Sequence, residues 1–262
     1  MRNPKLALAI AVAAAIGWSC IGVVASAAPP KCSDLDAVPT AAPAPVAPPP
    51  ATPSAAPITT TSATSPTPAP AVGQACQIQK TDPAYSINIV FPLDFPDPKA
   101  LDYVKQTRDG FLNVAKSGGP RDMPYELDTT MSEYTSALPG RGTQSLVFKT
   151  YQSVGGAHPQ TFYQAFNWDQ TNRKPIAIDT LFKEGTAPFP VIYPVVQAEA
   201  TKQFGDAATI SPGSGLDPSK YQNFAITNDA IVFFFDQGSL LPESTGAFSV
   251  SVPRGPIDPM IA

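Results

Sequence analysis

The sequence predicts an α+β domain, in which an antiparallel sheet carries two packed helices, preceded by a proline-rich disordered tract. Three observations support this fold class. Several segments after residue 76 alternate between apolar and polar side chains, which is the period of a strand. Two other segments repeat apolar residues at helical spacing. A long segment nearer the N-terminus is rich in proline and carries no charged residue.

The first 27 residues are typical of a secretory signal peptide. Arg2 and Lys5 precede an almost continuous apolar run over 6–24, and residues 25–27 (Ala-Ser-Ala) provide a small-residue cleavage site. An uncleaved membrane anchor is the alternative, because the run approaches the ~20 residues that a span needs. With cleavage we expect a secreted or extracellular protein, either free or associated with the cell wall, without stable membrane insertion.

The charge balance argues against two classes of partner. Removing Arg2 and Lys5 with the leader leaves 15 basic against 21 acidic residues, so the net charge moves from −4 to −6. An acidic, charge-poor chain lacks the basic surface that binds nucleic acids and anionic lipids. We therefore expect no nucleic-acid partner.

Two cysteines remain after the leader, Cys32 and Cys76. In an exported chain, a pair of cysteines indicates one disulfide, with two free thiols as the alternative. Cys32 lies in a short N-terminal segment, 28–36. The tract 37–72 follows, with eleven prolines between Pro39 and Pro70. Such a composition cannot bury a core, so the tract is predicted to be disordered.

The folded domain is predicted over 73–262, about the size of one domain. Asp97-Pro98 provides an N-cap and a proline at the first helical position, which predicts a helix over 98–116. A second helix fits 190–204. Strands are predicted at 85–91, from 125, and at 144–151, 161–168 and 247–252, with an extended piece at 176–182 and a helical turn at 256–261. Residues 223–235 are typical of a hairpin whose turn, Asn228-Asp229, tolerates positive φ, and its second strand, 231–235, should be central.

His158, the one histidine of the chain, lies in the stretch Gly155-Gly156-Ala157-His158-Pro159. Any Ser-His-acid chemistry must pass through it. The structural interpretation is that the glycines form a tight turn at positive φ and that His158 donates to a backbone carbonyl there. The candidates for a binding surface are Gly155, Gly156 and His158. Tyr163, on the opposite strand face from Phe162 and Trp168, is a further candidate.

The sequence motifs predict no cofactor and no metal site. The sequence has no G-x-G-x-x-G, P-loop, H-E-x-x-H or C-x-x-C motif. Ser214 lies in Pro-Gly-Ser-Gly-Leu, which lacks the flanking glycines of a hydrolase nucleophile elbow. Among the acidic residues, Asp97 is better explained as the N-cap of a helix than as a calcium ligand.

Eight short motifs resemble the secreted immunogenic-protein (skin-test antigen) family of mycobacteria. They are residues 73–79, 82–85, 141–144, 166–169, 173–175, 215–218, 221–224 and 240–243. The resemblance extends from Cys32 to Ala262, with the proline-rich tract as an insertion, and it supports a Cys32–Cys76 bond. The 155–159 turn and the 223–235 hairpin more distantly resemble the extracellular domain of lysozyme-sensing anti-sigma factors.

The resemblance implies a partly β-grasp-like sheet and an extracellular binding role. It also implies esterase-like activity in some members, with no catalytic residue set to transfer. The leading hypothesis is thus a secreted binding or immunogenic domain whose partner is an envelope or host protein. The alternative is a weak carboxylesterase for short acyl esters, in which His158 would be the base.

Overall fold

The computed structural model describes residues 30–41, 74–117, 123–137, 142–155, 158–205 and 208–262. Several predictions fall outside these ranges. They are the signal peptide 1–27, most of the proline-rich tract (42–72), and Gly156.

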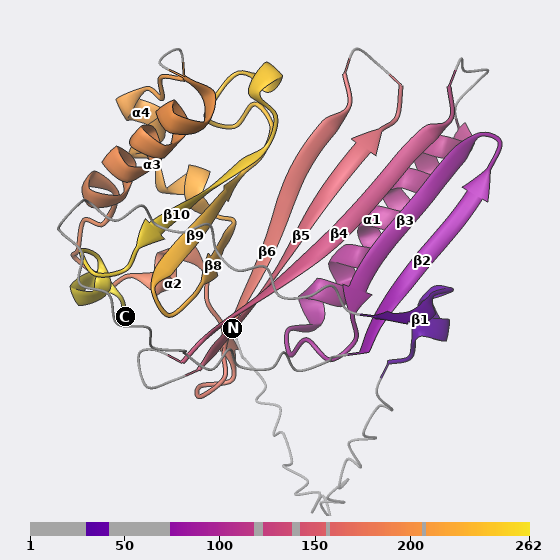
Figure 1. The fold of residues 1–262 in the computed structure, drawn as a ribbon. Helices are drawn as coiled ribbons and strands as arrows, with labels where there is room; N and C mark the ends of the chain where they lie inside the picture. Colours follow the sequence, from indigo (N-terminus) through magenta and orange to yellow (C-terminus); the bar gives the residue numbers. More distant parts are fainter. Residues whose placement is uncertain (1–29, 42–73, 118–122, 138–141, 156–157, 206–207) are drawn as a thin grey trace, which may run out of the picture. The chain divides into compact units, whose positions relative to one another are not determined.

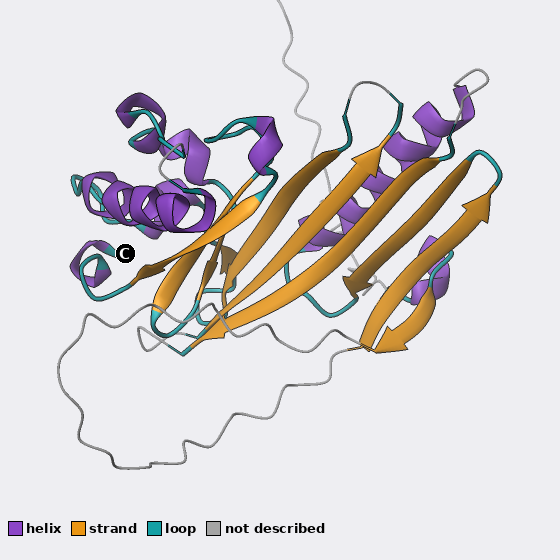
Figure 2. Cartoon of the chain, turned by 45° about the horizontal axis from the view of Figure 1, so that its top comes forward, coloured by secondary structure: helices purple, strands orange, loops and turns teal. Residues whose placement is uncertain are grey.

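A seven-stranded sheet forms the larger half of the fold (Figures 1 and 2), with its strands in sequential order. The predicted strands at 85–91, 144–151 and 161–168 are confirmed. The seven strands are β1 (Val38–Ala41), β2 (Gln74–Asp82), β3 (Tyr85–Pro92), β4 (Tyr125–Ser136), β5 (Thr143–Ser153), β6 (Gln160–Asp169) and β7 (Lys174–Pro175).

One strand pair departs from the predicted antiparallel sheet. β3 and β4 run parallel, with Tyr85 opposite Tyr125 and Ile89 opposite Thr129. The reason is the crossover through α1 (Pro98–Ser117), because a helix between two neighbouring strands returns the chain to the same end of the sheet. The helix itself begins as predicted, since the Asp97 carboxylate accepts a hydrogen bond from the Lys99 backbone N–H at 3.0 Å.

Helix α1 covers one face of the large sheet, behind β3 and β4 in Figure 1. Val104 and Phe111 pack there against Ile87, Ile89 and Leu127 of the sheet. The segment before the tract joins this core: Cys32, Leu35 and Ala37 belong to the same cluster, and η1 (Cys32–Leu35) is a 3-10 turn. The predicted disulfide between Cys32 and Cys76 is present.

The prediction that disorder begins at residue 37 is wrong for the start of the proline-rich tract. Ala37 is buried, and Val38–Ala41 forms strand β1, paired antiparallel with β2. A strand that contains Pro39 is tolerated here because β1 lies at the edge of the sheet, where proline's missing N–H interrupts no interior ladder.

The predicted α+β class, with two helices packed on β-structure, is confirmed. The strands are divided between two sheets, however, and not gathered in the one sheet expected, because the last three strands form a second sheet. Its order is β10 (Phe248–Pro253), β9 (Ala230–Phe235) and β8 (Phe224–Ile226). β9 is central and buried on both faces, as predicted. Helix α3 (Phe189–Phe204) covers one face through Ile192, Val196 and Ala200.

The remaining short elements refine the expectations. The piece predicted as extended contains a helical turn, α2 (Ile178–Leu181), which forms because the Ala177 N–H donates to the Thr180 hydroxyl at 2.9 Å. The Asn228-Asp229 turn forms without positive φ in either residue, and the Thr227 hydroxyl closes it through Ala230. The other short helices are α4 (Pro212–Gly215), η2 (Pro218–Tyr221), η3 (Glu243–Thr245) and η4 (Asp258–Met260), the last in the predicted C-terminal turn.

The small sheet packs against the large sheet on the face opposite α1. Tyr134 and Val147 meet Ala225, Val232 and Phe234 there in an apolar cluster. Along the free edge of β6, backbone N–H groups donate hydrogen bonds to side chains instead of to another strand. These bonds run from the N–H groups of Thr161, Tyr163 and Ala165 to the side chains of Gln237, Asp236 and Asn223. Such capping blocks the edge against further strand pairing.

Candidate functional site

The stretch around His158 forms the connection between β5 and β6. Gly155 has φ +74°, and a Cβ at this residue would lie 3.0 Å from the Tyr125 hydroxyl, so both backbone and space require glycine here. His158 is exposed. Within the part of the chain that is described, it has no hydrogen bond, so the expected bond to a carbonyl is not found. No serine of the described residues is bonded to it either.

Tyr163 lies on the opposite strand face from Phe166 and Trp168, as the alternation predicts. That face is not open at this point. The ring packs against Phe234 with centroids 5.2 Å apart, and burial raises the pKa of its hydroxyl to about 12. The small sheet therefore occupies the surface on which Tyr163 was a binding candidate.

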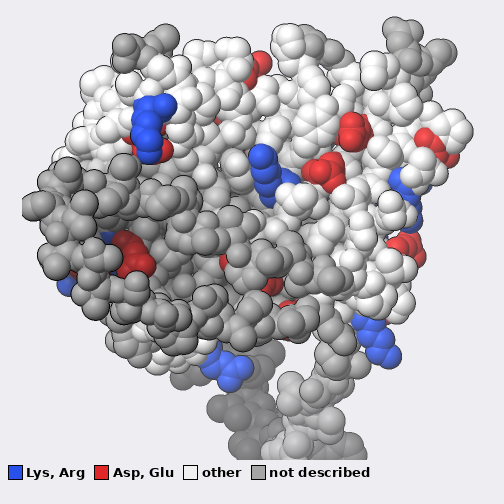
Figure 3. Space-filling model, viewed as in Figure 1, with Lys and Arg blue, Asp and Glu red and all other residues white. Residues whose placement is uncertain are grey.

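The part of that face that stays open carries a shallow polar groove of about 300 Å³ across β2, β3 and β4. In Figure 3, acidic side chains lie on this open half with basic ones beside them. The polar residues that line the groove come from three neighbouring strands: Gln77, Gln79, Thr81, Ser86, Asn88, Glu126 and Asp128.

Three of these side chains form a hydrogen-bonded row across the strands. The Gln77 amide donates to the Asn88 carbonyl oxygen at 2.7 Å, and the Asn88 amide donates to the Asp128 carboxylate at 2.6 Å. Asn88 and Asp128 are direct partners in the parallel pair, which brings their side chains together. The row holds the polar groups in fixed positions, while Gln79, Thr81 and Glu126 beside it are exposed.

Comparison with known proteins identifies the family of this chain. The chain is 56% identical over 191 residues to the immunogenic protein MPB64 of Mycobacterium bovis, covering 72% of this chain and 84% of that protein. It belongs to the family of these mycobacterial immunogenic proteins. It is also 48% identical over 189 residues to a protein named esterase Rv3036c of Mycobacterium tuberculosis, covering 72% of this chain and 83% of the relative.

A family model described as a protein of unknown function (DUF3298) matches residues 179–255 of this family member, a range that contains α3 and the small sheet. A crystal structure of a DUF3298 family protein from Pseudomonas aeruginosa is similar with a TM-score of 0.48 at 14% identity, over 72% of this chain and 94% of that one. Among the described residues, no helix has both the length and the apolar character of a membrane span.

The groove was not predicted from the sequence. Its signal was present, because Gln77, Gln79 and Thr81 alternate with buried residues such as Ile78. The alternation predicts a half-open strand, but it does not reveal that β3 and β4 place Asn88 and Asp128 beside it.

Proposed function

We propose that this protein is a secreted binding domain that recognises an envelope or host protein through the polar groove on β2–β4. The observation that carries the proposal is the hydrogen-bonded row of Gln77, Asn88 and Asp128 on a sheet face that the small sheet leaves open. Membership of the immunogenic-protein family and the leader-like residues 1–27 support an extracellular setting.

The composition of the groove favours one kind of partner surface. Its groups are amides, hydroxyls and the two carboxylates of Glu126 and Asp128, with no basic side chain among the lining residues. Carboxylates accept hydrogen bonds most strongly from charged donors. The partner surface is accordingly rich in lysine and arginine, and it meets a chain whose own net charge is negative.

A site-specific photo-cross-linker tests the assignment. Placed at Gln79, in the groove, it should give a discrete adduct with a protein of the envelope or host fraction. Placed at Thr135, exposed on the same sheet outside the groove, it should not give this adduct.

The variants Asn88→Ala and Asp128→Asn, combined with the Gln79 cross-linker, should reduce the adduct at least about tenfold, the scale of one charge-assisted hydrogen bond. Their stability should change by less than about 1 kcal/mol, because both side chains are only partly buried. An adduct that persists in both variants, or that forms equally from Thr135, would place the partner elsewhere.

A carboxylesterase is the second candidate, favoured by the 48% identity to a protein named as an esterase. For that function His158 would be the natural base, yet it is exposed at the β5–β6 connection. We expect any hydrolysis of p-nitrophenyl butyrate by the purified protein to survive His158→Ala. A loss of a hundredfold or more with unchanged melting temperature would instead make His158 a general base.

A further inference from the structure

Strand β4 continues after its neighbour β3 has ended. The parallel pairing of the two strands stops at Ile89 and Thr129, whereas β4 runs on to Ser136 in its pairing with β5. Figures 1 and 2 show β4 extending past the end of β3. Among the described strands, none pairs with β4 on this side over 131–135, the stretch that we call the β4 slot.

The slot presents backbone hydrogen-bonding groups to this open edge. The Tyr125 N–H donates to the Ala84 carbonyl at 2.9 Å, so the odd-numbered residues of β4 direct their N–H and C=O groups toward the β3 side. Met131, Glu133 and Thr135 continue this alternation, while the even-numbered residues bond to β5. The slot therefore offers the donors and acceptors that an added strand uses.

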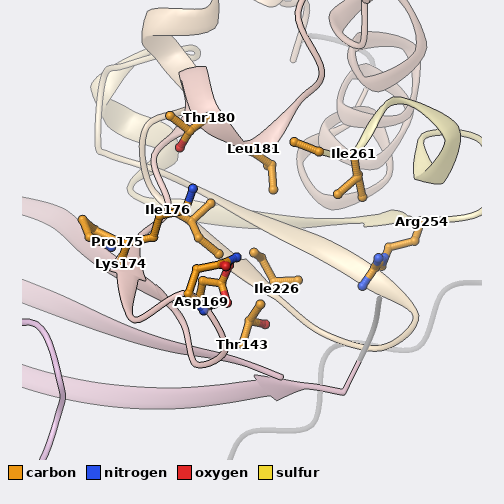
Figure 4. Close-up of a pocket in the computed structure, with 12 residues that line it drawn as sticks. Thr143, Asp169, Lys174, Pro175, Ile176, Thr180, Leu181, Ile226, Arg254 and Ile261 are labelled. Carbon is orange, nitrogen blue, oxygen red and sulfur yellow. Dashed lines mark hydrogen bonds between the residues drawn. The ribbon is translucent and has the colours of Figure 1, made fainter. Parts of the chain in front are cut away.

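The far end of the slot is closed by side chains. The Asn228 side-chain oxygen accepts from the Ala137 N–H at 2.8 Å, and the Arg254 guanidinium donates to the Ser136 hydroxyl at 3.3 Å. Arg254 lies at the small pocket of Figure 4, together with Thr143, the cross-strand partner of Ser136. Within the slot itself no side-chain cap of this kind is found among the described residues, in contrast to the edge of β6.

The slot is accessible and acidic. Thr135 is exposed and Glu133 is half-buried. Burial and then the nearby Asp94 carboxylate raise the pKa of Glu133, so its negative charge is poorly stabilised in the protein alone. Neither Asp94 nor Glu133 forms an ion pair among the described residues. A cationic group placed beside Glu133 would stabilise the charge.

This charge also discriminates among the possible occupants of the slot. Pairing with the slot of a second copy would bring Glu133 near its equivalent, and like charges facing each other destabilise a strand pair. The chain's own segment 42–72 contains no charged residue that could neutralise Glu133. The edge therefore favours an extended segment that carries a lysine or arginine.

We propose that the β4 slot binds an extended segment of another protein as an added strand, with a lysine or arginine of that segment beside Glu133. The backbone groups of Met131, Glu133 and Thr135 supply the hydrogen bonds, and the Glu133 carboxylate supplies the preference for a basic residue. The inference is independent of the proposed function, because the slot is an edge of β4 beyond the groove and takes a ligand of its own.

Amide hydrogen exchange of the whole protein, measured by NMR, tests the proposal with the peptide acetyl-Thr-Val-Thr-Lys-Thr-Val-Thr-amide as the probe. Without the peptide, the N–H groups of Met131, Glu133 and Thr135 should exchange faster than those of Ser132 and Tyr134, which bond to β5. At a peptide concentration about tenfold above the dissociation constant, exchange at the first three residues should slow about tenfold. Exchange at Ser132 and Tyr134 should stay unchanged.

Two N-methylated isomers of the peptide separate strand pairing from other contacts. One carries methyl groups on the odd-numbered backbone nitrogens and the other on the even-numbered ones, so only the isomer whose methyl groups point away from β4 should bind. Thr135→Pro, which removes one N–H of the open edge, should weaken binding about fivefold, whereas Thr135→Val should not. Replacing the lysine of the peptide by glutamate should weaken binding about threefold, and Glu133→Gln should abolish this difference.

The proposal is overturned if the peptide fails to slow exchange in the slot, or if both N-methylated isomers slow it equally. Slow exchange in the slot of the free protein would also overturn it, because another occupant would then be present. Loss of that protection on deletion of 42–72 would identify the chain's own segment, and loss on dilution would identify a second copy.

Discussion

The two halves of the outer face of the large sheet differ in what covers them, and strand β4 passes through both. In the open half, β4 presents Glu126 and Asp128 to the groove. In the covered half it presents Tyr134, which is 8% exposed and packs against Phe234 of the small sheet. A single strand therefore changes from polar to aromatic on the same face.

The side-chain chemistry of this sheet face depends on what packs against it. Where Val232 and Phe234 approach, the large sheet supplies Tyr134 and Val147, and burial of apolar area stabilises the contact. Where nothing approaches among the described elements, the sheet supplies side chains that bond to one another, as Gln77, Asn88 and Asp128 do. Among the described residues, the open half therefore carries polar side chains whose hydrogen bonds are made within the sheet face itself.

The largest expected effect comes from removing the aromatic contact of the covered half. Phe234→Ala should lower the free energy of unfolding by about 4 kcal/mol, since truncating a buried Phe leaves a cavity between Tyr134 and Tyr163. Urea denaturation measures this loss. Tyr151→Ala is the matched control, because Tyr151 is only half-buried and lies outside the cluster. Equal losses in the two variants would mean that the cover does not distinguish the halves.

A smaller effect is expected at the disulfide, on the α1 side of the large sheet. Replacing both Cys32 and Cys76 by Ser should lower stability by about 3 kcal/mol, because the bond closes a long loop in the unfolded chain. Cys32 and Leu35 are in the α1 core, so η1 and β1 should lose amide-exchange protection first. Protection in β8–β10 should remain, and a loss there would show that the two sheets unfold as one unit.

The elements predicted correctly are those fixed by neighbouring residues. Asp97 caps α1 as its position before Pro98 predicts, and the 231–235 run is the buried central strand of its sheet. Gly155 has the positive φ expected of it. In each case a propensity, a cap or a backbone constraint acts within a few residues, so the sequence pattern contains the information.

What the sequence did not predict depends on contacts between distant segments. Nothing local in Val38–Ala41 shows that it pairs with β2, since Pro39 argues against a strand until the edge position is known. The parallel β3–β4 pair and the division into two sheets are likewise decided by packing. The groove follows from the parallel pairing of β3 with β4.

The smallest expected effect separates two glutamates of β4. Glu126 is exposed at the groove, whereas Glu133 is half-buried farther along the strand. Burial and then the nearby Asp94 carboxylate raise the pKa of Glu133 above its usual value. Because the folded state holds this proton more tightly than the unfolded chain, the stabilisation is complete below the ordinary glutamate pKa. It is lost as the pH rises through the raised pKa.

At pH 7 the ionised Glu133 is therefore a cost, and Glu133→Gln should raise the free energy of unfolding there by less than Phe234→Ala lowers it. The gain should shrink as the pH falls toward 4 and vanish below about 4, near the ordinary glutamate pKa. Urea titrations at a series of pH values measure the difference between variant and wild type, with Glu126→Gln as the control on the open half. A gain that is the same at every pH would contradict the assignment, because it would come from packing and not from the proton.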